Sequence, residues 1–237
     1  MFEKNFYLET SYVDEYLELK LSSLFLMMQD VATEHAEILG VGKNQTIDKN
    51  LFWVITRYSV SINKLPKYLD KVTVRTYPGK NMKFIFPRYF EVLSETGELL
   101  IKASSTWVVV DRDTHKVNMD PFHGQLLPEE HHEGEEELPI KVTKRETSLI
   151  ENRVVRYSDI DLNRHLNNTR YIEYIVDSHD IDFYKTHRLK HIVINYEKEI
   201  KSGDVVSIKS NHENPEYLVG MLKDEISFET LIEYENR

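Results

Sequence analysis

The strongest constraint on the fold of this chain is an order of elements that occurs twice, once on each side of a short acidic segment. In the first copy, apolar residues recur with a helical period through residues 24–39, and Gly40 follows them. In the second copy, we expect the matching helix over residues 169–184. Strand-like runs rich in β-branched and aromatic residues follow each helix. The repeat predicts an α+β protein with two similar halves, each a helix against an antiparallel sheet.

The expected strands are separated by turn sequences such as Tyr77-Pro78-Gly79. They cover residues 52–65, 70–78, 83–94 and 99–114 in the first copy, and 191–200, 204–213, 216–225 and 226–235 in the second. Residues 64–76 also align without gaps with residues 198–210, which pairs Asp70 with Asp204. The two halves are therefore predicted to have the same order of elements.

The acidic segment combines prolines, a glycine and dense negative charge with almost no apolar side chains. Such a composition is typical of an exposed connection between domains. We expect an N-terminal domain over residues 1–128, an acidic linker over 129–139 and a C-terminal domain over 140–237. The paired His131 and His132 are interpreted as part of this solvated linker and are assigned no function.

The residue counts exclude several classes of protein. None of the 237 residues is cysteine, which excludes a disulfide framework, a thiolate nucleophile and a cysteine-based metal site. The net charge of −10 argues against nucleic-acid binding, because phosphates are neutralised by clustered Lys and Arg. No run approaches the roughly 20 apolar residues of a membrane span. Residues 1–20 mix charged and apolar side chains, unlike a secretory signal, so we expect a cytoplasmic protein.

Polar residues gather just before the second helix. If this approach is extended, Asp161, Asn163 and His165 share one face, because side chains alternate with period two. A carboxylate, an amide and an imidazole would then lie together beside a helix N-terminus, whose N–H groups suit a developing oxyanion. We interpret Asn167 and Asn168 as helix caps.

The internal repeat offers a comparison for this cluster. An alignment of the two helix approaches pairs Leu17, Leu19 and Leu21 of the first copy with Asp161, Asn163 and His165 of the second. One copy is apolar at these positions and the other is polar. The contrast favours one active site in each chain, in the second half.

At these residues the sequence resembles the acyl-ACP thioesterases of plants and bacteria, which have tandem hotdog domains, each a sheet wrapped around a long helix. The resemblance runs almost end to end. It includes FWVITRYSV at 52–60, LPKYLDKVTVRTYP at 65–78, STWVVVDRDT at 105–114, RYSDIDLNRHLNN at 156–168 and INYEKEIKSGD at 194–204. The D-x-D-x-N-x-H-x-N-N segment is its specific part.

The resemblance implies catalytic roles for Asp161, Asn163, His165 and Glu199. Plant members have a Glu-Cys pair at the last position, whereas here Ile200 follows Glu199, which leaves direct attack by water as the simpler chemistry. Glu199 would then act as general base, Asp161 would hold His165, and Asn163 would bind the water or the thioester oxygen. Which of His165 and Glu199 takes the proton stays open.

Neighbouring residues receive supporting roles from the same resemblance. Asp159 would support the structure of the motif. Arg156 and Arg164 would approach the phosphopantetheine or the acidic carrier protein, although either side chain can equally be a solvated charge.

The acyl chain would lie in a tunnel formed mainly by the first domain. Candidate lining residues are Phe25, Met27, Met28, Trp53 and Ile55, although residues of this type at this spacing more often simply pack in a core.

The expected function is hydrolysis of acyl-[acyl carrier protein] to release a free fatty acid, with acyl carrier protein as the partner and without a cofactor or metal. An acyl-CoA thioesterase is the nearest alternative. A non-catalytic acyl-binding hotdog protein and a hotdog dehydratase are others. A homodimer is allowed but not required, since the repeat already forms an internal pseudo-dimer.

Overall fold

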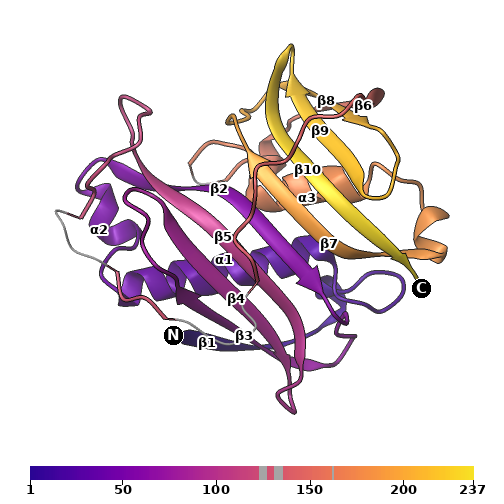
Figure 1. Cartoon of the computed structure of the whole chain (residues 1–237), viewed down its shortest axis with the longest axis horizontal. Coiled ribbons are helices and arrows are strands. Elements are labelled where there is room, and N and C mark those ends of the chain that lie inside the picture. Colours follow the sequence, from indigo (N-terminus) through magenta and orange to yellow (C-terminus); the bar gives the residue numbers. More distant parts are fainter. Residues whose placement is uncertain (123–126, 131–135, 162) are drawn as a thin grey trace. The chain divides into compact units, whose positions relative to one another are not determined.

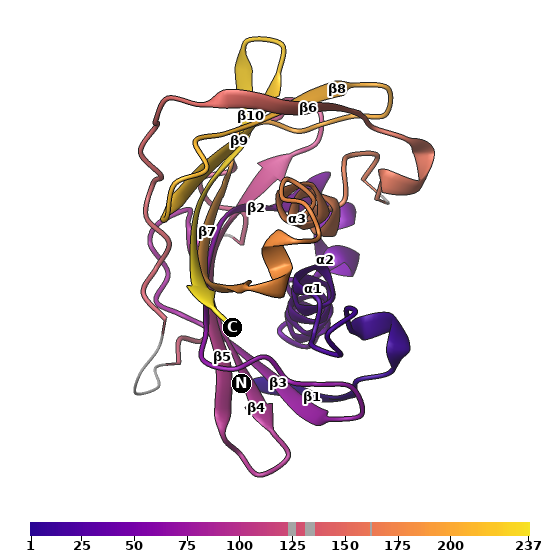
Figure 2. The same ribbon diagram turned by 90° about the vertical axis from the view of Figure 1, so that its right-hand side faces the viewer.

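Each half of the chain builds one antiparallel sheet with a helix on one side of it (Figure 1). The computed structural model describes residues 1–122, 127–130, 136–161 and 163–237. These residues divide into two units, Met1–Pro139 and Ile140–Arg237. Figure 2 shows α1 beside the sheet of the first unit and α3 beside the sheet of the second. This is the α+β architecture that the repeat predicts.

The first unit has five strands in the order β1-β3-β4-β5-β2, with antiparallel pairing throughout. Its elements are β1 (Phe2–Tyr7), η1 (Thr10–Tyr12), α1 (Leu21–Ile38), α2 (Lys43–Ile47), β2 (Leu51–Ile62), β3 (Lys71–Pro78), β4 (Phe86–Ser94) and β5 (Leu99–Asp111). The four strands expected from the sequence in this half are β2 to β5. The short β1 and α2 are additions that the sequence pattern did not indicate.

The second unit has the order β7-β10-β9-β8-β6. Its elements are β6 (Ser148–Val154), η2 (Tyr157–Asp159), α3 (Asn168–Val176), η3 (Phe183–Lys185), β7 (His187–Tyr196), β8 (Val205–Ser210), β9 (Glu216–Leu222) and β10 (Glu225–Asn236). β7 to β10 are the four expected strands. β1 and β6 carry mainly exposed or half-exposed side chains at the edges of their sheets, so neither has an apolar pattern that the sequence could reveal.

Helix α1 follows the predicted apolar stripe closely. Leu24, Met28 and Val31 are fully buried, and burial of each such side chain stabilises the fold by roughly 1.5–3 kcal/mol. The helix ends at Ile38, and Gly40 then takes the left-handed conformation with φ +72° that terminates many helices.

The predicted helix over 169–184 is wrong in its second half. α3 stops at Val176, and the chain then turns before the short η3. The hydroxyl of Ser178 donates to the Ile175 carbonyl at 2.7 Å, and the Asp180 carboxylate accepts the Phe183 N–H at 3.0 Å. Ser and Asp side chains that bond to the local backbone in this way compete with helical hydrogen bonds and end the helix early.

The acidic segment is held to the sheet at its far end. Glu136 is buried, accepts a hydrogen bond from the Ser59 hydroxyl at 3.1 Å and lies 3.6 Å from the Lys102 ammonium. The interpretation as an exposed connection therefore fails at Glu136. His131 and His132 lie outside the described residues. Within the described residues, no helix has the length and apolar character needed to cross a membrane.

A buried polar pair lies between α1 and β4. The Arg88 guanidinium donates to Nδ1 of His35 at 3.1 Å and to the Thr76 hydroxyl at 3.2 Å. Burial, followed by the positive charge of Arg88, lowers the pKa of His35 to about 4, and burial lowers the pKa of Arg88 to about 10. His35 is thus neutral in the folded chain and accepts the hydrogen bond.

We expect this pair to make stability depend on pH. Between the ordinary histidine pKa of about 6.5 and the folded value, the unfolded chain binds a proton that the folded chain does not, so stability falls as pH falls, by up to about 1.4 kcal/mol per pH unit. From pH 7 to pH 5 the loss from His35 should be about 2 kcal/mol. Urea denaturation of wild type and His35→Gln at both pH values measures it. The loss of unfolding free energy between pH 7 and pH 5 should be about 2 kcal/mol smaller in His35→Gln than in wild type. The control His115→Gln, at an exposed histidine, should show the wild-type loss. Equal losses in all three proteins would contradict the lowered pKa of His35.

Candidate active site

The polar motif ahead of α3 is a tight turn, and the expected extended segment is wrong. The Asp161 carboxylate accepts the backbone N–H of Asn163 at 2.8 Å and that of His165 at 3.2 Å. The Asp161 N–H donates to the His165 carbonyl at 2.8 Å, and Arg164 takes a left-handed φ of 66°. Ile160 and Leu166 then face each other across an antiparallel bridge. One carboxylate therefore closes the loop that carries the motif.

The first unit contains the same turn. Asp14 accepts the backbone N–H groups of Tyr16 at 2.9 Å and Glu18 at 3.0 Å, and Leu17 has a φ of 60°. The Asp14 N–H donates to the Glu18 carbonyl at 2.9 Å. These hydrogen bonds match, one by one, those of the second-unit turn.

This match corrects the register of the repeat. In the hydrogen-bonded register, Asp14, Tyr16 and Glu18 correspond to Asp161, Asn163 and His165, so the alignment of Leu17, Leu19 and Leu21 with those three residues is wrong by three positions. The backbone turn, and not the run of leucines, defines the register. The carboxylate that builds the turn is common to both units, whereas Asn163 and His165 occur only in the second.

His165 and Glu199 form the close pair of the site. Nε2 of His165 lies 3.0 Å from a carboxylate oxygen of Glu199, with the two side chains 20% and 33% exposed. Glu199 lies in the loop after β7, and the Leu166 N–H donates to the Ile200 carbonyl at 2.8 Å, which ties this loop to the turn. The partner of the imidazole is thus Glu199, while Asp161 bonds to the backbone of His165. In the first unit the equivalent hydrogen bond runs from Leu19 to Pro66, so Leu65 occupies the place of Glu199.

The amide of Asn163 is half-exposed and makes no hydrogen bond to any residue that the structure describes. Some of the N–H groups at the start of α3 already have hydrogen-bond partners. The Asn167 side chain accepts from the Thr169 N–H at 3.0 Å, which confirms the cap predicted at Asn167, whereas Asn168 is the first residue of α3. The Arg170 N–H donates to the Asn167 carbonyl at 2.8 Å. Two of the early helix N–H groups are therefore already used, so Asn163 is a better placed donor for an oxyanion than those groups.

Tyr171 is a residue that the sequence pattern did not single out. It lies on α3, is buried and packs its ring against Tyr196 and Phe228. Burial raises the pKa of its hydroxyl, and the negative charges of Glu199 and Asp161 raise it further, opposed by a hydrogen bond from the Ile200 backbone. The phenol therefore stays protonated beside the two carboxylates. In the sequence, Tyr171 fits the apolar pattern of an ordinary helix core residue, so the sequence alone gives no reason to assign it to the site.

The remaining motif residues lie at the rim. The Asp159 carboxylate accepts the Arg156 N–H at 2.8 Å and lies 3.6 Å from the Arg170 guanidinium, in line with a supporting role. Arg156 and Arg164 are exposed. Two positive side chains therefore flank the turn on its solvent side.

Comparison with known proteins decides the family. The model of the acyl-ACP thioesterase N-terminal domain matches residues 1–120, and that of the acyl-ACP thioesterase C-terminal domain matches residues 142–235. The chain belongs to the acyl-ACP thioesterase family. A palmitoyl-acyl carrier protein thioesterase of Gossypium hirsutum is 29% identical over 221 residues, covering 87% of this chain and 54% of that protein. The chain spans about half the length of the curated relatives it matches.

Solved structures of the family have the same fold. A crystal structure of an acyl-ACP thioesterase from Bacteroides thetaiotaomicron matches with a TM-score of 0.85 and 25% identity, over 98% of this chain and 97% of that one. A 12:0-ACP thioesterase from Umbellularia californica matches with a TM-score of 0.86 and 19% identity, over 100% of this chain and 97% of that one. The expected tandem hotdog fold is confirmed.

The shared turn predicts how Asp161 acts. Asp161→Ala removes the acceptor of two backbone N–H groups and should lower the free energy of unfolding by about 1–2 kcal/mol, and Asp14→Ala should do the same in the first unit. Asp161→Asn retains a side-chain oxygen and should lose less than half as much. Urea denaturation of the three variants measures the changes. A loss in Asp161→Asn as large as in Asp161→Ala would show that the charge, not the pair of hydrogen bonds, stabilises the turn.

Proposed function

We propose that this acyl-ACP thioesterase family member hydrolyses the thioester of a fatty acyl-carrier protein and releases the free fatty acid. The observation that carries this proposal is the 3.0 Å contact between His165 and Glu199, on the turn that also carries Asn163, whose side-chain amide has no hydrogen-bond partner among the described residues. A base and a neutral hydrogen-bond donor at one place are what attack on a carbonyl carbon requires. Relatives named as palmitoyl- and oleoyl-acyl carrier protein thioesterases support the substrate class.

Water is the nucleophile in this proposal, because the chain has no cysteine. The Glu199–His165 pair accepts a proton from water, and the water oxygen bonds to the thioester carbon. The Asn163 amide donates to the carbonyl oxygen as it gains negative charge. The carbon–sulfur bond then breaks, and the proton passes to the leaving thiolate. The 3.0 Å contact allows the proton to move between imidazole and carboxylate, so the two side chains act as one unit.

Asp161 acts through the backbone in this scheme. Its carboxylate stabilises the turn that contains Asn163 and His165. Ile200, at the place of the plant cysteine, is fully buried, and its carbonyl accepts the Leu166 N–H. It therefore serves the structure of the loop that presents Glu199.

We assign the acyl chain to the N-terminal unit and the chemistry to the C-terminal unit. Helix α1 supplies Phe25, Met27 and Met28, which are buried in the first unit, and flexible Met side chains adapt readily to an apolar ligand. Arg156 and Arg164 are exposed beside the catalytic turn, where they can pair with an acidic carrier protein. The preferred partner is therefore acyl carrier protein and not acyl-CoA.

The test is release of free thiol from a panel of acyl-carrier proteins and acyl-CoAs. Wild type should hydrolyse the carrier-bound substrates with the higher kcat/KM. His165→Ala and Glu199→Gln should each lower kcat by about 10²–10⁴, the usual contribution of a positioned acid or base. Glu197→Gln removes an exposed carboxylate from the same loop and should leave kcat within about twofold.

Other results would overturn the proposal. Equal or faster turnover of acyl-CoA would make the chain an acyl-CoA thioesterase. Tight acyl binding without turnover by wild type would make it a non-catalytic binding protein. Full activity of both site variants would place the chemistry elsewhere in the chain.

A further inference from the structure

A second histidine–carboxylate cluster lies at the other end of α3. Among the residues that the structure describes, His179, His212 and Glu216 are the one group of three metal-binding side chains whose donor atoms all lie within 4.8 Å of one another. His179 follows the C-terminal end of α3, whereas the catalytic turn precedes its N-terminal end. Nine helical residues, about 13 Å, separate these two ends. None of the three residues belongs to the proposed catalytic set.

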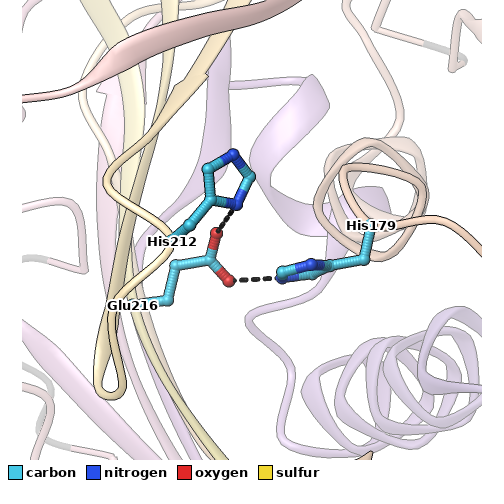
Figure 3. Close-up of side chains that lie close together, drawn as sticks. All are labelled: His179, His212 and Glu216. Carbon is cyan, nitrogen blue, oxygen red and sulfur yellow. Dashed lines mark hydrogen bonds and ion pairs between the residues drawn. The ribbon is translucent and has the colours of Figure 1, made fainter. Parts of the chain in front are cut away.

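The three side chains come from three separate places in the fold. His179 lies in the loop after α3, His212 lies in the turn between β8 and β9, and Glu216 begins β9. Figure 3 shows the two imidazoles directed at the carboxylate from two sides, with one ring at each oxygen. Nε2 of His179 lies 2.7 Å from one oxygen of Glu216, and Nδ1 of His212 lies 3.7 Å from the other.

The His179–Glu216 hydrogen bond does not account for the second imidazole. A separation of 3.7 Å is too long for a hydrogen bond, yet the His212 nitrogen faces the carboxylate oxygen. The Glu216 side chain is 1% exposed, and buried charges are normally paired or bound to metal. Glu216 already has His179 and Ser210 as hydrogen-bond partners, and a cation between the three groups would bring the His212 imidazole into the same set.

The spacing suits a zinc-type ion. Donor atoms at 2.0–2.1 Å from a tetrahedral zinc lie about 3.3 Å apart. In the structure the two imidazole nitrogens lie 2.7 and 3.7 Å from different oxygens of Glu216, and one donor atom from each of the three residues lies within 4.8 Å of the others. His212 is 48% exposed and in a turn, so its ring can close the remaining gap. Two imidazoles and one carboxylate form a recognised zinc ligand set, with water in the fourth position.

Neighbouring residues support the three proposed ligands. The His179 ring stacks on Phe183 with ring centres 3.8 Å apart and an angle of 9°. The Ser210 hydroxyl donates to Glu216 and also accepts the backbone N–H of His212 at 2.9 Å, which links two ligand residues through one side chain. Such supporting contacts orient metal ligands in known sites.

We propose that His179, His212 and Glu216 bind a divalent transition-metal cation of the zinc type, which fastens the β8–β9 turn to the loop after α3. The ion would take no part in the proposed thioester hydrolysis, because the cluster is separate from His165 and Glu199. Since only the folded chain brings the three ligands together, binding should stabilise the second unit.

The test uses the full chain, freed of metal with a chelator that is then removed, and Zn²⁺ as the probe. Calorimetric titration should show one Zn²⁺ bound per chain, and the thermal unfolding midpoint should rise with Zn²⁺ concentration. His212→Ala and Glu216→Gln should each weaken binding at least tenfold. Because His212 is exposed, His212→Ala should still fold. It therefore tests Zn²⁺ binding even if Glu216→Gln does not fold.

Two controls make the result specific. His115→Ala replaces another exposed histidine with the same left-handed φ of 53°, and it should bind Zn²⁺ like wild type. His165→Ala should also bind normally, since it removes only the catalytic pair. The proposal is overturned if wild type shows no saturable binding, if His212→Ala binds as tightly as wild type, or if His165→Ala loses the ion. The readouts are independent of thioesterase activity, so they stand apart from the test of the proposed function.

Discussion

The hydrogen bonds from two backbone N–H groups to one aspartate carboxylate determine the shape of the site. Asp161 accepts them from Asn163 and His165, and Asp14 makes the same pair in the first unit. The turn places a non-glycine residue, Arg164 or Leu17, at positive φ, which costs about 1–2 kcal/mol. The two hydrogen bonds offset that cost and let the chain enter the helix immediately after the turn.

The duplicated turn separates structural from chemical roles. Both units keep the aspartate and the left-handed residue, but the histidine position holds Glu18 in the first unit, and Leu65 stands in place of Glu199. One backbone arrangement therefore carries the proposed catalytic pair in the second unit and no such pair in the first. Function resides in the side chains placed on the repeated scaffold and not in the scaffold itself.

Two clusters of imidazole and carboxylate side chains in the second unit differ in the exposure of their carboxylates. Glu199 is 33% exposed beside His165, whereas Glu216 is 1% exposed between two imidazoles. Water reaches the first pair, which suits proton transfer to and from a substrate. The second carboxylate is buried, and its partners in the structure are the His179 imidazole and the Ser210 hydroxyl. Similar side chains thus suit a reaction at one end of α3 and a bound cation at the other.

The sequence by itself determined the order of elements, the buried stripe of α1, the eight central strands and the residues proposed for catalysis, because periodicity and a dense polar motif are local properties of the chain. Tertiary structure alone decided the register of the repeat, the early end of α3 at Val176 and the edge strands β1 and β6. It also brought His179 to Glu216, 37 positions away. The edge strands and the His179–Glu216 contact depend on pairing between separate elements, which no local pattern of side chains records. The register and the end of α3 depend on short-range hydrogen bonds from side chains to backbone, which the periodic apolar pattern does not show.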